Sequence, residues 1–337
     1  MPVKLDVIPA ESGIQYLAAT ASAVHSAAEG LIMFTLYRYP FAAMGSRCEI
    51  RLYAPSEESA AACARAAVND VLRLETKYSR YRDDSVTAAI NRVAAGGGAI
   101  DVDAETATLL DYAATCYEQS DGLFDLTSGV LREVWSADRR ELPDTDTLQR
   151  LLARVGWNKV RWQSPRLVFG FPGMEIDFGG VVKEYAADRA ATLCAEAGFR
   201  HGLVDLGGDI KIVGPHPDGT PWAVGIQHPR IAETVMATLD LFQGAIATSG
   251  DYERFVEIDG RRYSHILSPR TGMPVCGLAG VSVAAPECVV AGSATTIAML
   301  MEDRGAQWLD EVGLPHVWMD QALRLGGTFA VSGTLHS

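Results

Sequence analysis

The chain has 337 residues, of which 48% are hydrophobic and 21% charged, with a formal net charge of −13 at pH 7. This length is enough to bury a large core, in one large domain or two medium-sized ones. The acidic balance argues against a nucleic-acid partner, because nucleic-acid-binding proteins usually carry a basic surface, and no apolar run is long enough to insert across a membrane.

The six cysteines are scattered and form no Cys-x-x-Cys pair. Several occupy apolar positions, where free cysteine packs as a small hydrophobic side chain, so we expect a reducing compartment and no metal-thiolate site. Residues 1–33 are rich in Ala and Ser and lack a lipoprotein-type cysteine. We interpret them as a disordered tail or the product of a start codon placed too far upstream, and we expect one domain at residues 34–337 of a cytoplasmic protein.

The predicted elements alternate between strands and helices from residue 36 onward. Two short strands within residues 36–53 are joined by a turn at 44–46. A helix follows at 56–76 with Ser56 as its N-cap, and a loop leads into a second helix capped by Asp84 or Ser85. The remaining expected helices cover residues 103–120, 132–165 (a polar lid or surface excursion), 182–197, 291–301 and 306–312. The remaining expected strands cover 167–171 and 175–178 (a hairpin around Pro172-Gly173), 203–206, 222–227, 235–241, a hairpin turning at Asp259-Gly260, 281–285 and a closing pair.

The stretch 176–209 is the centre of this pattern. An apolar run ends at Asp177, Gly179-Gly180 interrupts it, and helical spacing follows at once. Such a strand, glycine turn and helix can hold a phosphorylated ligand, because glycine lets the backbone approach the phosphates and the helix N-terminus presents free N–H groups. Lys183 adds a cation at that end. Gly-Gly pairs are equally typical of plain helix-packing turns, so both interpretations stay open at this point.

Seven motifs in a fixed order extend the argument beyond this stretch. They are MGS (44–46), YSRYRDDS (78–85), SDGLFDLT (120–127), IDFGGVVKEYAAD (176–188), LVDLGGDI (203–210), TSGDYER (248–254) and SHILSPRTGMP (264–274). Together they resemble the ApbE-type flavin transferases, the FAD:protein FMN transferase family, from about Thr35 to the C-terminus. The resemblance implies a T-fold-like architecture of the α+β or mixed α/β class, with a largely antiparallel sheet and packed helices. It also implies that FAD is split at its pyrophosphate, that FMN passes through a phosphoester bond to a Thr or Ser of a target flavoprotein, and that AMP leaves.

The same resemblance assigns site residues. The implied flavin-contacting positions are Met44, Tyr81, Leu123, Phe124, Asp125, Asp177, Lys183 and Leu267. A methionine and aromatic rings can stack on the isoalloxazine or adenine ring, and a lysine can offset pyrophosphate charge. For Met44, Tyr81 and Phe124 the alternative is plain core packing.

His265 and Arg270 are the implied catalytic residues. Phosphoryl transfer to a hydroxyl needs a base of near-neutral pKa, which is the role of His265; the alternative is a core histidine bonded to backbone. Arg270 either holds a phosphate bidentately or pins a turn through Asp251.

The chain departs from the family at the implied Mg²⁺ site. Where the family carries A-D-A-x-x-T, residues 291–296 read A-G-S-A-T-T, so Gly292 replaces the ligand aspartate. Thr296 and the backbone carbonyl near Gly180 remain as implied ligands. A hard cation prefers carboxylate oxygens, so the site should be weak unless another acid replaces the aspartate. The candidate acids are Glu184 (which replaces the glycine of the family's Lys-Gly-Tyr and is expected on the helix surface), Asp177, Asp205, Asp209 and Asp251.

Four functions follow from these observations. The first is an FMN transferase, and the second is a pyrophosphatase that converts FAD to FMN and AMP with water as acceptor. The third is a flavin-binding protein without catalysis, which the missing aspartate favours. A dinucleotide-dependent oxidoreductase ranks last, because no Gly-x-Gly-x-x-Gly opens a helix after an N-terminal strand.

Overall fold

A computed structural model describes residues 22–23, 33–135, 141–231, 234–252 and 254–329. Within them the fold is built on a nine-stranded sheet of strand order β1-β2-β3-β7-β8-β11-β14-β15-β16. Every neighbouring pair in this sheet is antiparallel. Its strands are β1 (Ser22–Ala23), β2 (Thr35–Ala43), β3 (Ser46–Ala54), β7 (Gly202–Leu206), β8 (Asp209–Gly214), β11 (Ala245–Gly250), β14 (Leu278–Ala285), β15 (His316–Asp320) and β16 (Leu325–Gly327).

Three smaller sheets are also antiparallel. They consist of β9 (Trp222–Gln227) with β10 (Val235–Leu241), β12 (Phe255–Ile258) with β13 (Arg261–Ser264), and β4 (Gly98–Asp101), β6 (Arg166–Phe169) and β5 (Val160–Gln163). The predicted strands 222–227 and 235–241 and the hairpin turning at Asp259-Gly260 are confirmed.

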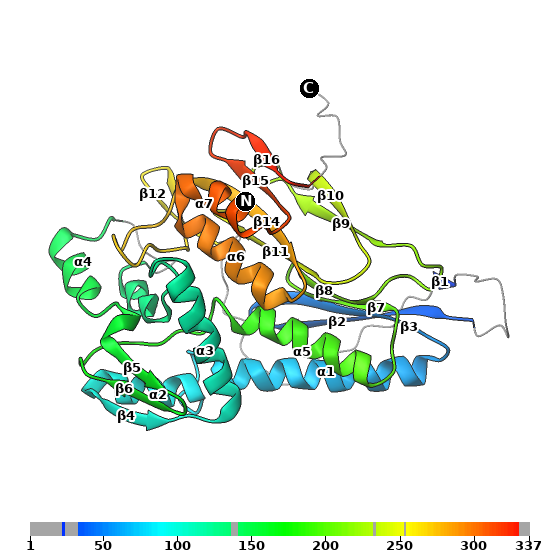
Figure 1. Ribbon diagram of the computed structural model, residues 1–337, viewed down its shortest axis with the longest axis horizontal. Helices are drawn as coiled ribbons and strands as arrows, with labels where there is room; N and C mark the ends of the chain where they lie inside the picture. Colours follow the sequence, from blue (N-terminus) through cyan, green and yellow to red (C-terminus); the bar gives the residue numbers. More distant parts are fainter. Residues whose placement is uncertain (1–21, 24–32, 136–140, 232–233, 253, 330–337) are drawn as a thin grey trace.

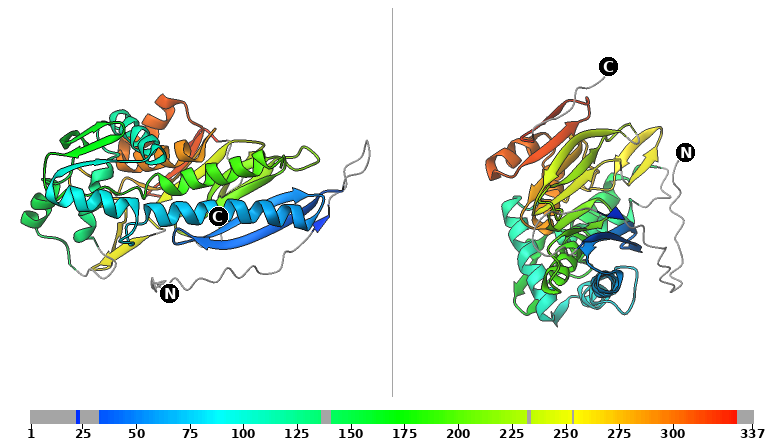
Figure 2. Two further views of the ribbon diagram at one scale, coloured as in Figure 1. Left: turned by 90° about the horizontal axis from the view of Figure 1, so that it is seen from below. Right: turned by 90° about the vertical axis from the view of Figure 1, so that its right-hand side faces the viewer.

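Helices cover one face of the large sheet (Figure 1). Helices α1 and α5 lie side by side, and α1 runs along much of the molecule (Figure 2). The helices are α1 (Glu57–Tyr78), α2 (Val86–Gly96), α3 (Ala104–Gln119), η1 (Leu126–Glu133), α4 (Thr145–Leu152), η2 (Trp157–Lys159), α5 (Val182–Glu196), α6 (Cys288–Leu300), η3 (Glu302–Arg304) and α7 (Gly305–Val312). Helices α2, α3 and α4 gather with the β4-β6-β5 sheet at one end of the long axis (Figure 1).

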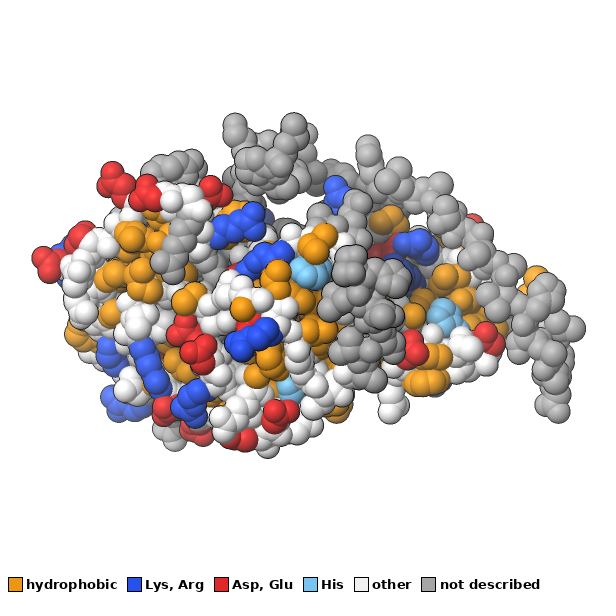
Figure 3. All heavy atoms as spheres, turned by 90° about the horizontal axis from the view of Figure 1, so that it is seen from above, with side chains coloured by type: hydrophobic (Ala, Val, Ile, Leu, Met, Phe, Trp, Pro, Cys, Tyr) orange, Lys and Arg blue, Asp and Glu red, His pale blue; other side chains and the backbone are white. Residues whose placement is uncertain are grey.

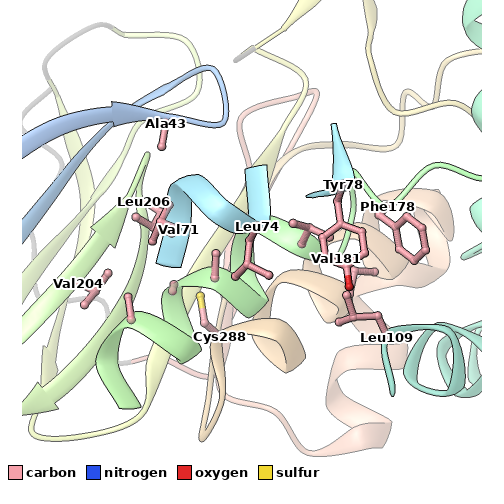
Figure 4. Packing of buried hydrophobic residues seen from close by; sticks show 14 of the residues in the cluster. Ala43, Val71, Leu74, Tyr78, Leu109, Phe178, Val181, Val204, Leu206 and Cys288 are labelled. Atoms are coloured by element: carbon pink, nitrogen blue, oxygen red, sulfur yellow. The ribbon is translucent and has the colours of Figure 1, made fainter. Parts of the chain in front are cut away.

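The sequence explains why α1 and α5 meet. The Ser56 side chain accepts the Ser59 N–H at 3.3 Å and caps α1, as predicted, and Glu57 and Glu58 suit the positive helix N-terminus. Small buried residues on both helices let the backbones approach closely, with Leu74 of α1 and Cys288 of α6 in the same cluster, and Phe178 packs on Tyr78 at the end of α1 (Figure 4). This packing fixes the start of α5 against α6.

The hairpin expected at 167–178 does not form. Its first half, β6, pairs instead with β4 and β5. The backbone of Ile176 is bonded by the Asn91 side chain, which accepts its N–H at 2.7 Å and donates to its carbonyl at 3.0 Å. The Asp177 N–H donates to the Leu126 carbonyl at 2.9 Å. Because these partners replace a strand neighbour, residues 175–178 run as irregular chain into α5, and the predicted strand before the Gly179-Gly180 pair is wrong.

The polar segment 132–165 is also only partly as predicted. Its described residues include the α-helix α4, the short η2 and the strand β5. Helix α4 is not a surface excursion, because Leu148 and Leu151 are buried in a cluster with residues of η1. Residues 136–140 lie outside the described residues.

The six cysteines are all free thiols. Of residues 1–33, only 22–23 and Met33 are described, so the predicted N-terminal extension lies almost entirely outside the described residues. Among the helices of the described part of the chain, none is both long and apolar enough to cross a membrane. The face seen from above carries acidic and basic side chains interspersed with hydrophobic ones (Figure 3).

Candidate active site

Three of the quoted motifs meet at the N-terminus of α5. A Cβ built on Gly180 would lie 3.5 Å from the Phe124 ring, so the 120–127 turn packs directly on the glycine pair. Arg270 donates to the Asp121 carboxylate at 2.7 Å and to the Asp121 carbonyl at 2.5 Å. These contacts tie the 264–274 loop to the 120–127 turn and leave Arg270 paired with Asp121, not with Asp251.

Asp177 is held by two arginines. Arg80 Nη1 lies 2.8 Å from Asp177 Oδ2, Arg132 donates to the same oxygen, and the Gly179 N–H donates to Oδ1 at 3.0 Å. Arg80 also donates to the Tyr81 hydroxyl at 2.7 Å, and its guanidinium carbon lies 4.8 Å from the centre of that ring. Tyr81 itself is 83% exposed, which leaves its ring available to a ligand.

Lys183 lies in the first turn of α5. Its Nζ is 2.5 Å from Oδ2 of Asp209, a carboxylate that is 2% exposed at the start of β8. The other oxygen of Asp209 accepts the Thr248 N–H from β11 at 3.2 Å. This chain of contacts fixes the lysine beside a helix N-terminus that no side chain caps.

The turn between β2 and β3 reaches the same region. Met44 adopts a positive φ of 53° and its N–H donates to Glu75 Oε1 at 2.7 Å. A Cβ built on Gly45 would lie 3.6 Å from an Arg254 guanidinium nitrogen. The turn therefore lies beside Arg254, the residue that positions His265.

His265 is held in one tautomer. Its Nδ1 lies 3.0 Å from the Arg254 carbonyl oxygen, which only accepts, so Nδ1 carries the proton and Nε2 has the free lone pair. The side chain keeps contact with solvent. Even so, the His265 pKa is lowered to about 4. The main cause is desolvation of the ring by the surrounding protein, and the positive charges of Arg254, Lys183 and Arg80 add to it. His265 is thus a neutral acceptor at neutral pH, with three cations near it.

Three of the predicted flavin-contacting residues, Asp125, Leu267 and Leu123, are largely engaged in contacts within the fold. Asp125 is buried, caps η1, and accepts from the Thr127 N–H at 2.8 Å, the Thr127 hydroxyl at 2.6 Å and the Trp157 N–H at 3.0 Å. Burial raises the Asp125 pKa more than these bonds lower it. Leu267 forms a β-bridge with Pro274 that closes its loop, and Leu123 packs partly buried in a cluster that includes Ile266.

In the region implied for the cation, the structure buries a carboxyl group that the sequence analysis expected at the surface. Glu184 is buried, not on the helix surface as expected, and its Oε2 has no hydrogen-bond partner. A Cβ built on Gly292 would lie 2.4 Å from Glu184 Cγ, so the glutamate occupies the space beside the glycine. Burial, and then the neighbouring Asp209 carboxylate, raise the Glu184 pKa to about 8.

These residues fit a hard cation. The Glu184 carboxyl, whose Oε2 has no hydrogen-bond partner, becomes the donor type that Mg²⁺ uses once a bound cation displaces its proton to solvent. One or two carboxylates are enough for Mg²⁺ when substrate phosphates and water supply the remaining ligands. The described residues hold no group of three or more His, Cys, Asp or Glu side chains arranged around a metal position. A cation would therefore depend on Glu184 together with hydroxyl, carbonyl and phosphate oxygens.

The arginines of the site were not assigned by sequence reasoning. Arg80 lies within a quoted motif, where its position two residues after Tyr78 is the only signal. Arg254 ends the quoted motif at 248–254, but nothing in that motif points to His265, whose Nδ1 lies beside the Arg254 carbonyl. Arg132 carries no local signal, because its partner Asp177 comes from another segment.

Comparisons with known proteins identify the family of the chain. The model of the ApbE family matches residues 44–318. An FAD:protein FMN transferase of Chlamydia pneumoniae is 32% identical over 249 residues, covering 71% of this chain and 77% of that protein. One of Treponema pallidum is 32% identical over 300 residues, covering 79% and 82%.

Solved structures give the same result for the fold. The crystal structure of an ApbE protein from Thermotoga maritima matches with a TM-score of 0.79 and 29% identity, over 87% of this chain and 97% of that one. The apo form of the flavinyl transferase ApbE of Pseudomonas stutzeri matches with a TM-score of 0.77 and 25% identity, over 88% and 95%. The predicted architecture and the predicted resemblance are both confirmed, and the chain belongs to the ApbE family.

Proposed function

We propose that this chain is an FAD:protein FMN transferase, which splits FAD, attaches FMN through a phosphoester bond to a Thr or Ser of a target flavoprotein and releases AMP. Membership of the ApbE family and relatives of that name support the activity. The observation that carries the proposal is the orientation of His265, whose Nε2 is an unprotonated base close to Lys183 and Arg80. A base beside fixed cations suits attack by a hydroxyl on a phosphate.

In the proposed transfer, one P–O bond forms and one P–O bond breaks. The acceptor hydroxyl oxygen bonds to the phosphorus on the FMN side of the pyrophosphate, and the bond from that phosphorus to the bridging oxygen breaks. The hydroxyl proton passes to His265 Nε2, and AMP leaves with the bridging oxygen. Lys183 and Arg80 offset negative charge on the phosphates, which is the main catalytic requirement of phosphoryl transfer.

The flavin itself would be held by residues of the 44–46, 78–85 and 120–127 motifs. Tyr81 offers an exposed ring and Met44 lies at the tip of the β2–β3 turn. Phe124 is 4% exposed and packs on Gly180 within the core, so it would support the flavin site from beneath. Rings and a thioether of this kind stack well on an isoalloxazine. Asp125 and Leu267 would shape the pocket, and Arg270 would lie at its rim.

A divalent cation, when bound, would supply charge neutralisation at the pyrophosphate. In the proposed site, the Thr296 hydroxyl and the backbone near Gly180 are assigned to it, with Mg²⁺ as the predicted ion. The acceptor protein is a flavoprotein with an accessible Thr or Ser, and the cytoplasm stays the predicted location.

A second candidate is hydrolysis of FAD to FMN and AMP, with water in place of the protein hydroxyl. The exposure of the His265 side chain favours it, because water reaches the same base. The two activities differ only in the acceptor, so one experiment separates them.

The test is to incubate the purified protein with FAD, with and without Mg²⁺, beside a flavoprotein domain that carries an acceptor Thr, and to weigh the domain. A gain of one FMN less one water is expected. His265→Gln should slow transfer by about 10²–10⁴-fold while FAD still binds, whereas the control His201→Gln should not. Release of FMN and AMP without a mass gain would favour the hydrolase, and FAD that stays intact would contradict both activities.

A further inference from the structure

Glu184 and Gly292 form a matched pair across the α5–α6 contact. Glu184 lies in the first turn of α5, and Gly292 lies in the second turn of α6. A Cβ at residue 292 would be 2.4 Å from Glu184 Cγ, 2.9 Å from its Cδ and 3.1 Å from its Oε1. Distances below 3 Å are incompatible with van der Waals contact, so the glutamate in this position requires a glycine at 292.

The Glu184 carboxyl is polar, buried and only partly satisfied. Glu184 is 8% exposed, and its Oε2 has no hydrogen-bond partner. A buried carboxyl oxygen without a partner destabilises the fold. A ligand that binds this oxygen is the simplest physical reason for keeping it there.

The surroundings indicate which ligand this is. Thr296 lies four residues after Gly292, on the same face of α6, and it is half-buried. Asp209 is close enough to act on the Glu184 charge, and Lys183 is bonded to Asp209. A carboxyl oxygen and a hydroxyl at the N-terminal end of α5, beside a lysine that suits a pyrophosphate, are hard oxygen donors.

We propose that Glu184 supplies the carboxylate that binds a hard divalent cation at this site, reaching from α5 into the space where an aspartate at residue 292 would lie. The inference rests on the proposed function, since the phosphates of FAD complete the coordination. The cation site is therefore not lost with the aspartate at 292, because α5, the helix that faces α6, supplies a carboxylate instead. In this arrangement an aspartate at 292 becomes usable only when Glu184 is removed.

The test measures cation binding directly, with Mn²⁺ as probe and its free-ion EPR signal as readout, in the presence of FAD and without acceptor protein. Wild type is expected to bind one Mn²⁺ per chain. Glu184→Gln, which keeps the shape, should weaken this binding at least tenfold. The control Glu196→Gln, an exposed glutamate at the end of α5, should leave it unchanged. The double variant Glu184→Gly/Gly292→Asp should restore binding to within a few-fold of wild type.

FAD binding, followed by flavin fluorescence in the same samples, separates this inference from the proposed function. Wild type that binds FAD but no Mn²⁺, or Glu184→Gln with unchanged Mn²⁺ affinity, would overturn the role of Glu184 and leave the transferase proposal standing. Wild type that binds neither would overturn both. If Glu184→Gln folds poorly, the double variant is the test. Its Mn²⁺ affinity should be close to that of wild type if a carboxylate in this space binds the cation, and loss of Mn²⁺ binding would overturn the proposal.

Discussion

Asp188 of α5 caps the N-terminus of α6 through Cys288. Its two carboxyl oxygens accept the Cys288 N–H at 2.7 Å and the Val289 N–H at 2.9 Å. Lys211 of β8 lies 3.5 Å from the same carboxylate and 2.6 Å from Glu287. The first turn of α6 is thus fixed to α5 one turn beyond Glu184, and this contact holds the two halves of the candidate site in register.

Asp188→Asn should change how stability depends on pH. Burial raises the Asp188 pKa from 3.8 to about 6, and the negative charge of Glu287 adds to this effect. The two backbone hydrogen bonds and Lys211 lower the pKa, but they only partly offset the burial. The folded chain therefore holds this proton more tightly than the unfolded chain. Its contribution to stability is complete below pH 4 and is lost as the pH rises through about 6, a change of at most about 3 kcal/mol.

Chemical denaturation of both proteins at several pH values checks this. The unfolding free energy of the variant relative to wild type should rise between pH 4 and pH 7. A constant difference across that range would mean that Asp188 is ionised with an ordinary pKa.

The candidate base predicts a second pH effect, on activity. The His265 pKa is lowered to about 4 from its ordinary 6.5, but contact with solvent limits the desolvation. The acid limb of kcat/KM should therefore have its midpoint between these values, with a plateau above pH 6.5, because only the neutral ring accepts a proton.

Transfer rates measured at low substrate from pH 4 to pH 8 give the profile. In His265→Gln the residual activity should lack this limb. A limb that persists in the variant would assign the titration to another group.

Gly292→Asp alone should destabilise the fold. The new Cβ would overlap Glu184 Cγ and bring a second carboxylate against a buried one. Overpacking of this kind costs about 1–3 kcal/mol, with charge repulsion in addition. Removing the Glu184 side chain in the same chain should recover most of the loss, so the two substitutions are expected to be strongly non-additive.

Thermal unfolding of the two single variants and the double variant measures this coupling. Additive effects would show that residues 184 and 292 do not share one space.

Much of the fold follows from local pattern, whereas the key contacts of the site do not. The spacing of apolar residues in α1 and the Ser56 cap are visible in the sequence, because both signals lie within one helix. The irregular path of Ile176 depends on Asn91, a partner from another helix, so an apolar run resembled a strand. Glu184 follows Lys183 in the first turn of α5 and resembles a surface position, because its burial against Gly292 involves another helix, α6. The motifs gave the family, but the pairing of Glu184 with Gly292 required the fold.

Asp125→Ala should lower the free energy of unfolding more than a substitution of an exposed residue does. Asp125 accepts three hydrogen bonds, from Thr127 and Trp157, and it is buried. Its removal leaves buried donors unsatisfied, at a cost of about 2–4 kcal/mol. Urea unfolding, with Asp121→Ala of the same turn as the exposed control, checks the difference; equal effects would show that the three bonds contribute little.

Arg270→Ala tests whether this residue acts on the substrate or only on its loop. Arg270 is paired with Asp121, and both side chains are well exposed, so losing the pair should change stability by less than about 1 kcal/mol. If Arg270 contacts a phosphate of FAD, the alanine variant should raise the KM for FAD by about tenfold, since a charge-assisted hydrogen bond is worth roughly 1.5–3 kcal/mol. Asp121→Ala keeps the guanidinium and removes only its partner, so its KM should stay near wild type. Equal rises of KM in the two variants would assign Arg270 to positioning the 264–274 loop, which reaches His265 at its other end.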